Sequence, residues 1–410
     1  MGTTGHLVAW ISSGLFGAAA CGGLLLLAQL AALRHHLRGR WPGMPRRLPG
    51  ISILKPLCGL DDELEANVCS FVALPYPRYE VLLGVRNRED PAFKVAQSMA
   101  RRWPERFRVV VQQGEPGLNP KVNQLITLAR AARHELLVIS DSNTRVAPDY
   151  LHEIAGHLSN PRVGLVTHPL AGVGEDRGGA RLGATLDNLH LSASITTGFA
   201  GAKYLCGKDY VVGKSMALRR TDLEAVGGFV AVKDVLAEDF VLGRLVPERL
   251  GKRVVLARTV VTCVSVRRTL AGFVRRYARW SVMQRQCAGL PAYFGLLLLN
   301  PVLLAAVGFL LAPTARSAAR VATLVAVRVA QDAAAARLLG RHVFRARALL
   351  AAPLRDLLVG AAWAQGLMTR SIDWRSNRLL VLRGSALRLA APGRPRRPAV
   401  AGTARASAAA

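Results

Sequence analysis

Between residues 50 and 265, short apolar runs alternate with segments whose apolar residues recur at helical spacing. The runs predict strands at 51–57, 79–85, 107–111, 135–140 and 162–167, and the periodic segments predict helices at 91–103 and 119–133. Apolar strands that alternate with helices are typical of a mainly parallel sheet covered on both faces. The pattern therefore predicts an α/β domain that binds its ligands beyond the carboxyl ends of the strands.

A long uncharged stretch precedes this domain. Residues 7–33 contain no charged side chain and exceed the roughly 20 residues that a helix needs to cross a bilayer. Arginines at 34, 38, 40, 46 and 47 follow with no acid among them. By the positive-inside rule, this basic flank places residues 48–285, which contain the predicted α/β domain, in the cytoplasm. We therefore expect an integral protein of a bacterial inner membrane with a transmembrane helix at 7–33.

The chain becomes apolar again after residue 285. Residues 288–315 are uncharged and predict a second membrane segment, which Asn300-Pro301 would kink or make re-entrant. Residues 316–347 hold seven Arg and one Asp, a composition that favours a basic helix on the membrane surface over a span.

Two further features complete the C-terminal part. Arg355-Asp356 interrupts an apolar stretch and indicates a paired charge within or beside the bilayer. We assign 286–385 to a membrane or interfacial region. Residues 390–410 are rich in Ala, Pro and Arg and predict a disordered basic tail.

Composition narrows the classes of partner. The net charge is +29, from 55 Lys+Arg against 26 Asp+Glu, on a chain that is 51% hydrophobic. Its arginines concentrate beside apolar segments and no aromatic platform accompanies them, so an anionic membrane surface fits better than nucleic acid. The six cysteines form no CxxC pair, which predicts reduced and mostly buried thiols. A non-enzymatic membrane carrier would explain the apolar segments but not the acids at strand ends.

Four polar clusters interrupt otherwise apolar parts of the sequence. They are 87–91, Asp141-Ser142-Asn143, Glu238-Asp239 at the start of a helix, and Arg275 to Trp280. Each alone is explained as a cap, a helix-dipole charge or an interfacial arginine. Together they suit sugar transfer from a nucleotide diphosphate. One carboxylate would hold a divalent cation, another would accept a proton, and arginines would hold phosphate oxygens.

The order of these residues resembles a known pattern. Asp90, Asp141, Asp239 and then Arg276-x-x-Arg279-Trp280 are similar to the D, D, D, (Q/R)xxRW series of membrane glycosyltransferases with the GT-A fold. That series alone would also admit chitin- or cellulose-synthase-like enzymes. Finer marks resemble the ceramide glucosyltransferase family, namely ILKPLCGLD (53–61), GLNPKVNQL (117–125), ISDSNTRVAPDYL (139–151), LAEDF (236–240) and DWRSNRL (373–379).

The resemblance implies roles for the acidic residues. Asp90 would contact the nucleotide, and Asp141 would bind the metal and the diphosphate. Asp239 would be the catalytic general base, with Glu238 as a supporting neighbour. Asn143 stands where many glycosyltransferases have a second metal-binding Asp, so cation binding would be weaker and more dependent on the donor.

The resemblance also implies roles for the basic segments. Arg276, Arg279 and Trp280 would lie near the diphosphate and the acceptor. Lys121 and Asn123 would contact donor phosphate or ribose. The family expectation is an inverting GT-A enzyme that uses Mg²⁺ or Mn²⁺ and UDP-glucose to glycosylate a ceramide-like membrane lipid. The alternative is N-acetylglucosamine transfer from its UDP derivative to a hopanoid, as in related bacterial enzymes.

Overall fold

A seven-stranded sheet forms the centre of the part of the chain that the structure describes. The computed structural model describes residues 3–340, 344, 346–374 and 377–390. In spatial order the strands are β3 (Phe107–Val111), β2 (Tyr79–Val85), β1 (Ile51–Pro56), β4 (Leu136–Ser140), β8 (Ser215–Arg219), β6 (Val163–Thr167) and β9 (Arg253–Leu256). Strand β8 is antiparallel to β4 and β6, and the other pairings are parallel. The predicted α/β class with a mainly parallel sheet is confirmed.

Helices cover both faces of this sheet. One face packs on α2 (Leu64–Cys69), α3 (Pro91–Arg102) and α5 (Tyr150–Leu158). The opposite face packs on α4 (Pro120–Ala131), α8 (Arg220–Ala225), the 3-10 turn η2 (Phe229–Val232) and α9 (Glu238–Leu250). Every position of β1 and β2 is buried, which explains why these strands are mostly apolar instead of alternating.

The predicted elements match the observed ones closely. Strands β2 and β3 have the expected bounds, and the helix expected at 119–133 is α4. This helix begins one residue later because Asn119 caps it, accepting hydrogen bonds from the backbone amides of Lys121 and Val122. Strands β8 and β9 of the main sheet were not predicted, and neither were two small sheets. The small sheets are β5 (Thr144–Arg145), β10 (Val261–Val264) and β7 (Leu170–Val173), and β11 (Ser371–Trp374), β12 (Asn377–Val381) and β13 (Leu387–Leu389).

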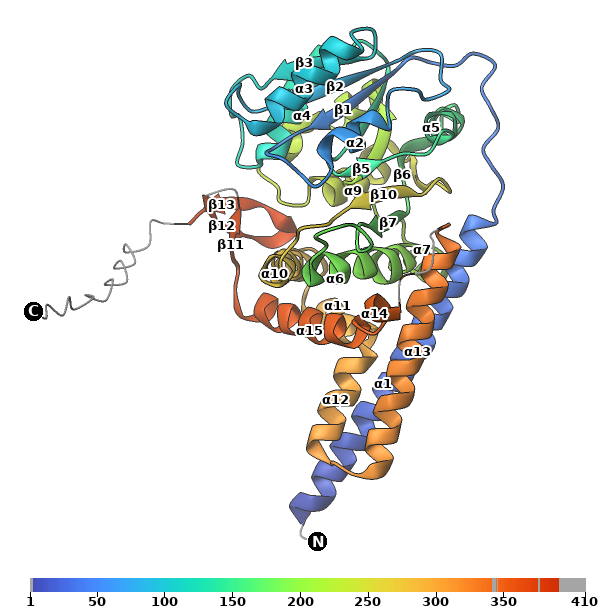
Figure 1. Cartoon of the computed structure of the whole chain (residues 1–410), viewed down its shortest axis with the longest axis vertical. Helices are drawn as coiled ribbons and strands as arrows, with labels where there is room; N and C mark the ends of the chain where they lie inside the picture. Colours follow the sequence, from blue (N-terminus) through green and yellow to red (C-terminus); the bar gives the residue numbers. More distant parts are fainter. Residues whose placement is uncertain (1–2, 341–343, 345, 375–376, 391–410) are drawn as a thin grey trace, which may run out of the picture.

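Below the sheet the molecule has two further tiers (Figure 1). The middle tier is helical and consists of α6 (Leu182–His190), the π-helical turn η1 (Leu191–Ile195), α7 (Thr196–Cys206), α10 (Leu270–Ala288), α11 (Leu290–Gly295), the 3-10 turn η3 (Leu296–Leu299), α14 (Ala346–Leu349) and α15 (Ala352–Met368). The lowest tier is a stalk in which α1 (Thr3–Leu37), α12 (Pro301–Leu311) and α13 (Ala315–Leu338) run side by side.

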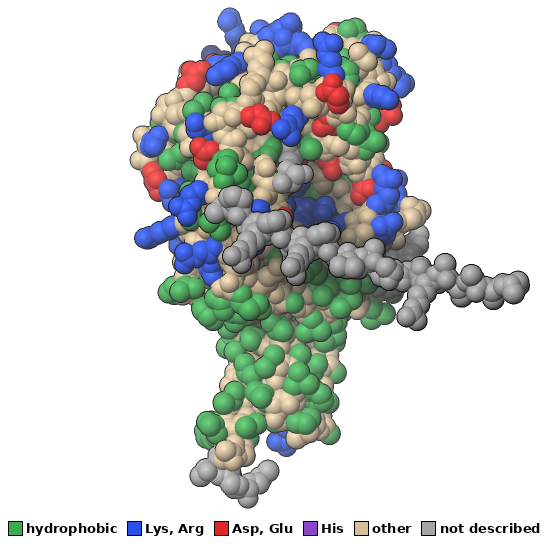
Figure 2. Space-filling view, turned by 90° about the vertical axis from the view of Figure 1, so that its left-hand side faces the viewer, with side chains coloured by type: hydrophobic (Ala, Val, Ile, Leu, Met, Phe, Trp, Pro, Cys, Tyr) green, Lys and Arg blue, Asp and Glu red, His purple; other side chains and the backbone are tan. Residues whose placement is uncertain are grey.

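The stalk contains the N-terminal apolar segment and part of the second one. Helix α1 is long and apolar enough to cross a membrane, and the predicted helix at 7–33 lies within it. In the described residues a second candidate exists only if the pair 290–299 and 301–311 counts as one broken span, and this pair is bent by 83°. The bend falls at Asn300-Pro301, as predicted. Figure 2 shows a stalk surface dominated by hydrophobic side chains, below a domain studded with Lys and Arg.

Helix α13 differs from its prediction. Instead of a separate basic surface helix, it is the third helix of the stalk. Its Arg328 is buried and paired with Asp332 and with Asp356 of α15, whose carboxylate oxygen is 3.1 Å from Arg328 Nε. Arg355 completes the cluster at 2.5 Å from Asp332 and 2.6 Å from Asp356. Because each arginine is neutralised by acids, the helix can pack inside the bundle, and the predicted Arg355-Asp356 pair is confirmed.

This buried cluster should be important for stability. We expect Arg355→Met to lower the free energy of unfolding by about 3–5 kcal/mol, because it leaves Asp332 and Asp356 to share one remaining arginine. Arg244→Met is the matched control, since Arg244 forms an exposed ion pair with Glu248 and its loss should cost less than about 1 kcal/mol. Thermal unfolding of both detergent-purified variants measures the difference. Equal midpoints would contradict a stabilising role for the cluster.

Two other predictions need comment. All six cysteines are free, but the prediction that most are buried is wrong, since Cys21, Cys58 and Cys206 are exposed and only Cys263 is fully buried among them. The exposed thiols lie on the outside of the stalk, in the loop after β1 and at the end of α7, where no core covers them. The predicted disordered tail, apart from Ala390, lies outside the described residues.

Candidate active site

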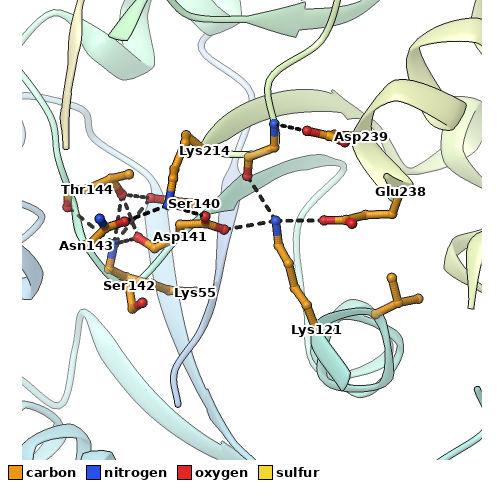
Figure 3. A network of polar contacts seen from close by, with 12 residues as sticks. Lys55, Lys121, Ser140, Asp141, Ser142, Asn143, Thr144, Lys214, Glu238 and Asp239 are labelled. Carbon is orange, nitrogen blue, oxygen red and sulfur yellow. Dashed lines mark hydrogen bonds and ion pairs between the residues drawn. The ribbon is translucent and has the colours of Figure 1, made fainter. Parts of the chain in front are cut away.

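The carboxylate of Asp141 lies at the carboxyl end of β4, where two lysines hold it (Figure 3). Lys121 Nζ, from α4, is 2.9 Å from Asp141 Oδ1, and Lys214 Nζ, from the loop before β8, is 2.8 Å from Asp141 Oδ2. Burial opposes ionisation of Asp141, but the two ammonium groups outweigh it and hold the pKa of this carboxyl well below its usual range. Asp141 is therefore an anion at neutral pH.

A third lysine fixes the turn that carries Asp141. The Nζ atom of Lys55, in β1, donates to the Asp141 carbonyl oxygen at 2.7 Å and to Thr144 Oγ1 at 3.2 Å. Lys55 is fully buried, and burial lowers its pKa to about 7. It thus ties the end of β1 to the turn after β4 and sets the position of the Asp141 backbone.

The residues at this turn fit a divalent cation only in part. Asp141 offers carboxylate oxygens, the ligands that Mg²⁺ prefers, and Mg²⁺ commonly uses one or two carboxylates together with substrate phosphates. Asn143 does not fit, because its Nδ2 donates to the Val264 carbonyl at 3.1 Å and its Oδ1 accepts from Lys214 at 2.8 Å. Within the described residues, no group of three or more His, Cys, Asp or Glu side chains could hold a metal ion. A metal would therefore be held by Asp141 and the donor's phosphates.

Glu238 and Asp239 begin α9 beside this cluster, as predicted, but their surroundings differ. Glu238 is buried, with one oxygen 2.8 Å from Lys121 Nζ and the other accepting from Asn119 Nδ2 at 3.3 Å. Asp239 is only partly buried and accepts from the backbone amides of Gly213 at 2.5 Å and Phe240 at 2.8 Å. Burial and the nearby Glu238 charge raise the pKa of Asp239 to about 6. Lys121 thus links Asp141 to Glu238, and Asp239 is the carboxylate with properties suited to a general base.

This pKa predicts a pH dependence. A general base is active when unprotonated, so the single-turnover rate should be full above pH 7 and fall about tenfold per pH unit as the pH drops below about 6. We expect an Asp239→Glu variant to shift the midpoint of this profile. The measurement is the single-turnover rate with saturating donor from pH 5 to 8. A rate that stays constant over this range would argue against Asp239 as the base.

Asp90 and Asn123 have structural partners. Asp90 follows β2 and caps α3, accepting from the backbone amides of Ala92 and Gly59, each at 2.9 Å. Strand β1 separates β2 from β4, so Asp90 lies at the same sheet edge as Asp141 but two strands away. The Asn123 amide holds the backbone of Gly117 at 2.8 and 3.0 Å, which shapes the loop before α4. Direct contact of either residue with the donor remains a prediction.

The arginine-rich motif lies on α10, in the tier below the sheet. Arg276 Nε is 3.6 Å from the carboxylate of Asp187 in α6, and its guanidinium stacks on Trp280 at 5.0 Å. Asp187 is buried, also pairs with Arg268 at 3.1 Å, and accepts from the Tyr277 hydroxyl at 2.8 Å. Arg279 and Trp280 are partly buried. Asp187 therefore positions the Arg276 and Tyr277 side chains of the motif.

The turn between β12 and β13 holds the loop that leads into Asp239, the general-base candidate. Ser385, at the turn between β12 and β13, accepts from the Leu236 amide through its carbonyl at 2.9 Å and from the Ala237 amide through its hydroxyl at 3.2 Å. Asn119 Nδ2 donates to the Val235 carbonyl of the same loop at 2.7 Å. The loop that leads into Asp239 is thus held by both Ser385 and Asn119.

The structure adds four residues that the motifs did not indicate, namely Lys55, Lys214, Asp187 and Ser385. Lys55 and Lys214 each interrupt an apolar run, ISILKPL and VVGKSMAL, and a lysine in such a run is a usable signal. Asp187 and Ser385 carry no comparable local signal, because their importance comes from contacts with residues 81 to 149 positions away in the sequence.

Comparison with known proteins places the chain among glycosyltransferases. The sequence model of glycosyl transferase family 21 matches residues 19–387. Ceramide glucosyltransferase 1 of Caenorhabditis elegans is 30% identical over 236 residues, which is 57% of this chain and 49% of the relative. Ceramide glucosyltransferase of Komagataella phaffii is 26% identical over 203 residues, 44% of this chain and 39% of the relative. The chain thus matches about half or less of the length of these curated relatives.

Among solved structures, a mannosyltransferase from Pyrobaculum calidifontis in complex with GDP-Man and Mn²⁺ is 20% identical, with a TM-score of 0.48. The alignment covers 88% of this chain and 99% of that protein.

Proposed function

Because the chain belongs to glycosyl transferase family 21, we propose that it transfers glucose from UDP-glucose to the primary hydroxyl of a ceramide-like membrane lipid. The observation that carries the proposal is the joint presence of a lysine-rich anion site at Asp141 and a carboxylate with a pKa of about 6 at Asp239. The curated relatives named above support glucose and ceramide, and no feature of the site favours the hopanoid alternative.

The reaction we propose is a direct displacement at the anomeric carbon. Asp239 accepts the proton of the acceptor hydroxyl while the hydroxyl oxygen forms a bond to the anomeric carbon. The bond from that carbon to the diphosphate oxygen breaks, UDP departs with the electron pair, and the configuration inverts. Lys121 and Lys214 stabilise the departing diphosphate with their ammonium groups, and Arg276 and Arg279 are proposed to assist from α10.

A divalent cation would further neutralise the negative charge of the diphosphate. Bound at Asp141, Mg²⁺ or Mn²⁺ would neutralise the diphosphate leaving group as a Lewis acid. Asp90 is proposed to contact the nucleotide, and Trp280 to face the acceptor. The apolar stalk would anchor the protein. We propose that it is an inner-membrane protein with its sheet in the cytoplasm, because the arginines at 34–47 lie in the last turn of α1 and directly after it.

Turnover by the purified, detergent-solubilised protein tests the proposal. UDP release should appear with UDP-glucose and ceramide together, and should need both. UDP-N-acetylglucosamine with a hopanoid polyol is the competing pair, and faster release with that pair would replace the proposed substrates. No UDP release with any lipid would favour a non-enzymatic membrane role.

A further inference from the structure

A cavity of about 120 Å³ lies in the middle tier, enclosed by α10, α6, η1, α1, η3 and α15. Apart from α1, these elements belong to the middle tier, which lies between the sheet domain and the stalk (Figure 1). One wall is a single face of α10, because Tyr277, Trp280, Ser281 and Gln284 all line it and are spaced by three, four and seven residues. The wall on α6 and η1 includes a π-helical turn, a distortion that is frequent at functional sites.

The wall on α10 connects the cavity to the catalytic domain. Trp280 lines the cavity and also packs against the large hydrophobic core of the sheet domain. The Arg276 guanidinium stacks on the same Trp280 ring at 5.0 Å. The cavity therefore adjoins the arginine-rich motif of α10.

The lining of the cavity includes polar side chains that could hydrogen-bond to a ligand. His190 Nδ1 is buried and has no hydrogen-bond partner within the described part of the chain. The His190 ring meets Tyr277 edge-on at 4.5 Å between centroids. Burial and the nearby Arg355 and Arg328 charges hold the pKa of His190 well below its usual range, so its neutral ring can exchange a hydrogen bond with a neutral ligand group. Gln284 adds a further hydrogen-bonding group, and the Ser194 hydroxyl, which accepts from Arg328 Nη2 at 2.6 Å, still has its own proton to donate.

The size of the cavity decides which part of a lipid it can take. About 120 Å³ is roughly the space of four water molecules, enough for a small polar head and too little for two alkyl chains. Leu26 and Leu299 line the cavity, while the neighbouring Leu24, Leu27 and Leu298 are exposed at the junction of α1 and η3. Alkyl chains could therefore leave along this apolar junction while the head stays inside.

We propose that this cavity binds the polar head of the lipid acceptor and that His190 is a specificity-determining contact for its hydroxyl or amide group. The inference rests on the proposed function and extends it by assigning the acceptor subsite. The matching ligand class is an amphiphile with neutral hydrogen-bonding groups next to two alkyl chains.

The test compares two identical substitutions. His190→Phe keeps a ring against Tyr277 but removes the nitrogen. His152→Phe is the matched control, since His152 of α5 meets Tyr76 edge-on at 5.2 Å and does not line the cavity. We expect His190→Phe to raise the KM for ceramide about 3- to 10-fold, with kcat and UDP affinity within about twofold of wild type, and His152→Phe to change none of these.

A second measurement locates the lipid without relying on turnover. A photoreactive ceramide is crosslinked to the full-length wild-type protein, and the labelled peptides are identified by mass spectrometry. We expect labels in 190–195, 277–284 or 296–299. If wild type releases UDP with ceramide but His190→Phe has the wild-type KM and the labels lie elsewhere, the assigned subsite is wrong and the proposed function stands. If wild type releases no UDP with any lipid, the proposed function itself fails.

Discussion

Replacement of Asp239 by asparagine is expected to lower kcat by about 10²- to 10⁴-fold and to leave UDP affinity within about twofold. The reason is that asparagine keeps the shape of the side chain and can still accept one backbone hydrogen bond, but it cannot take up a proton. Asp239 has no ion-pair partner among the described residues, so its loss should leave the lysine cluster at Asp141 intact.

The matched variant is Glu238→Gln, at the adjacent position. Glu238 is paired with Lys121 and buried, so its replacement should lower stability and have a milder effect on the rate than Asp239→Asn. Single-turnover rates and UDP titrations on both variants separate chemistry from binding. Wild-type turnover by Asp239→Asn, or a dead Glu238→Gln beside an active Asp239→Asn, would show that the base is misassigned.

Replacement of Asp141 by asparagine should have the second large effect, which is on UDP affinity. Whether the affinity falls or rises should depend on the presence of a divalent cation. With Mg²⁺ or Mn²⁺ present, we expect UDP affinity to fall about 10- to 100-fold, because the carboxylate that would hold the cation is gone. Without metal, UDP affinity should stay constant or rise, because Lys214 loses its carboxylate partner and Lys121 keeps only Glu238, which leaves more positive charge for the diphosphate.

Asp209→Asn is the control for this experiment. Asp209 pairs with Lys203 at 2.7 Å near the surface, so the same chemical change there should leave UDP binding unaltered. UDP titrations of the wild type and both variants, with a chelator and with added metal, give the full comparison. An equal loss of affinity for Asp141→Asn in both conditions would mean that Asp141 acts on the donor without a cation.

The local sequence predicted the sheet domain well because each element there carries its own signal. Buried strands such as β2 and β3 are apolar runs of the right length, and Asn119 and Asp90 mark the starts of their helices. The polar clusters in the sequence also placed Asp141 directly after a strand and Asp239 at the start of a helix, where the structure has them. Neighbouring residues in the sequence determine such strand positions and helix starts.

Local sequence could not predict the contacts that position the site residues, because these contacts join residues that are distant in the sequence. Lys214 reaches Asp141 only because β8 pairs antiparallel with β4. The position of α13 depends on Arg328 meeting Asp356 of another helix, and charge composition alone indicated a surface helix. Asn143 looked like a metal ligand by its spacing, but the packing of β10 against β5 turns its amide to the Val264 carbonyl.

The central claim is that this chain makes a glycosylated lipid, and the most direct test is lipid mass spectrometry. Wild type and Asp239→Asn are expressed in a host that lacks glycolipids but contains ceramide, and total lipid is analysed. We predict a hexosylceramide with a β-linked sugar in the wild-type cells, and its loss in the variant cells at equal protein level. Absence of any hexosylated lipid in the wild-type cells, or equal amounts in both, would contradict the account.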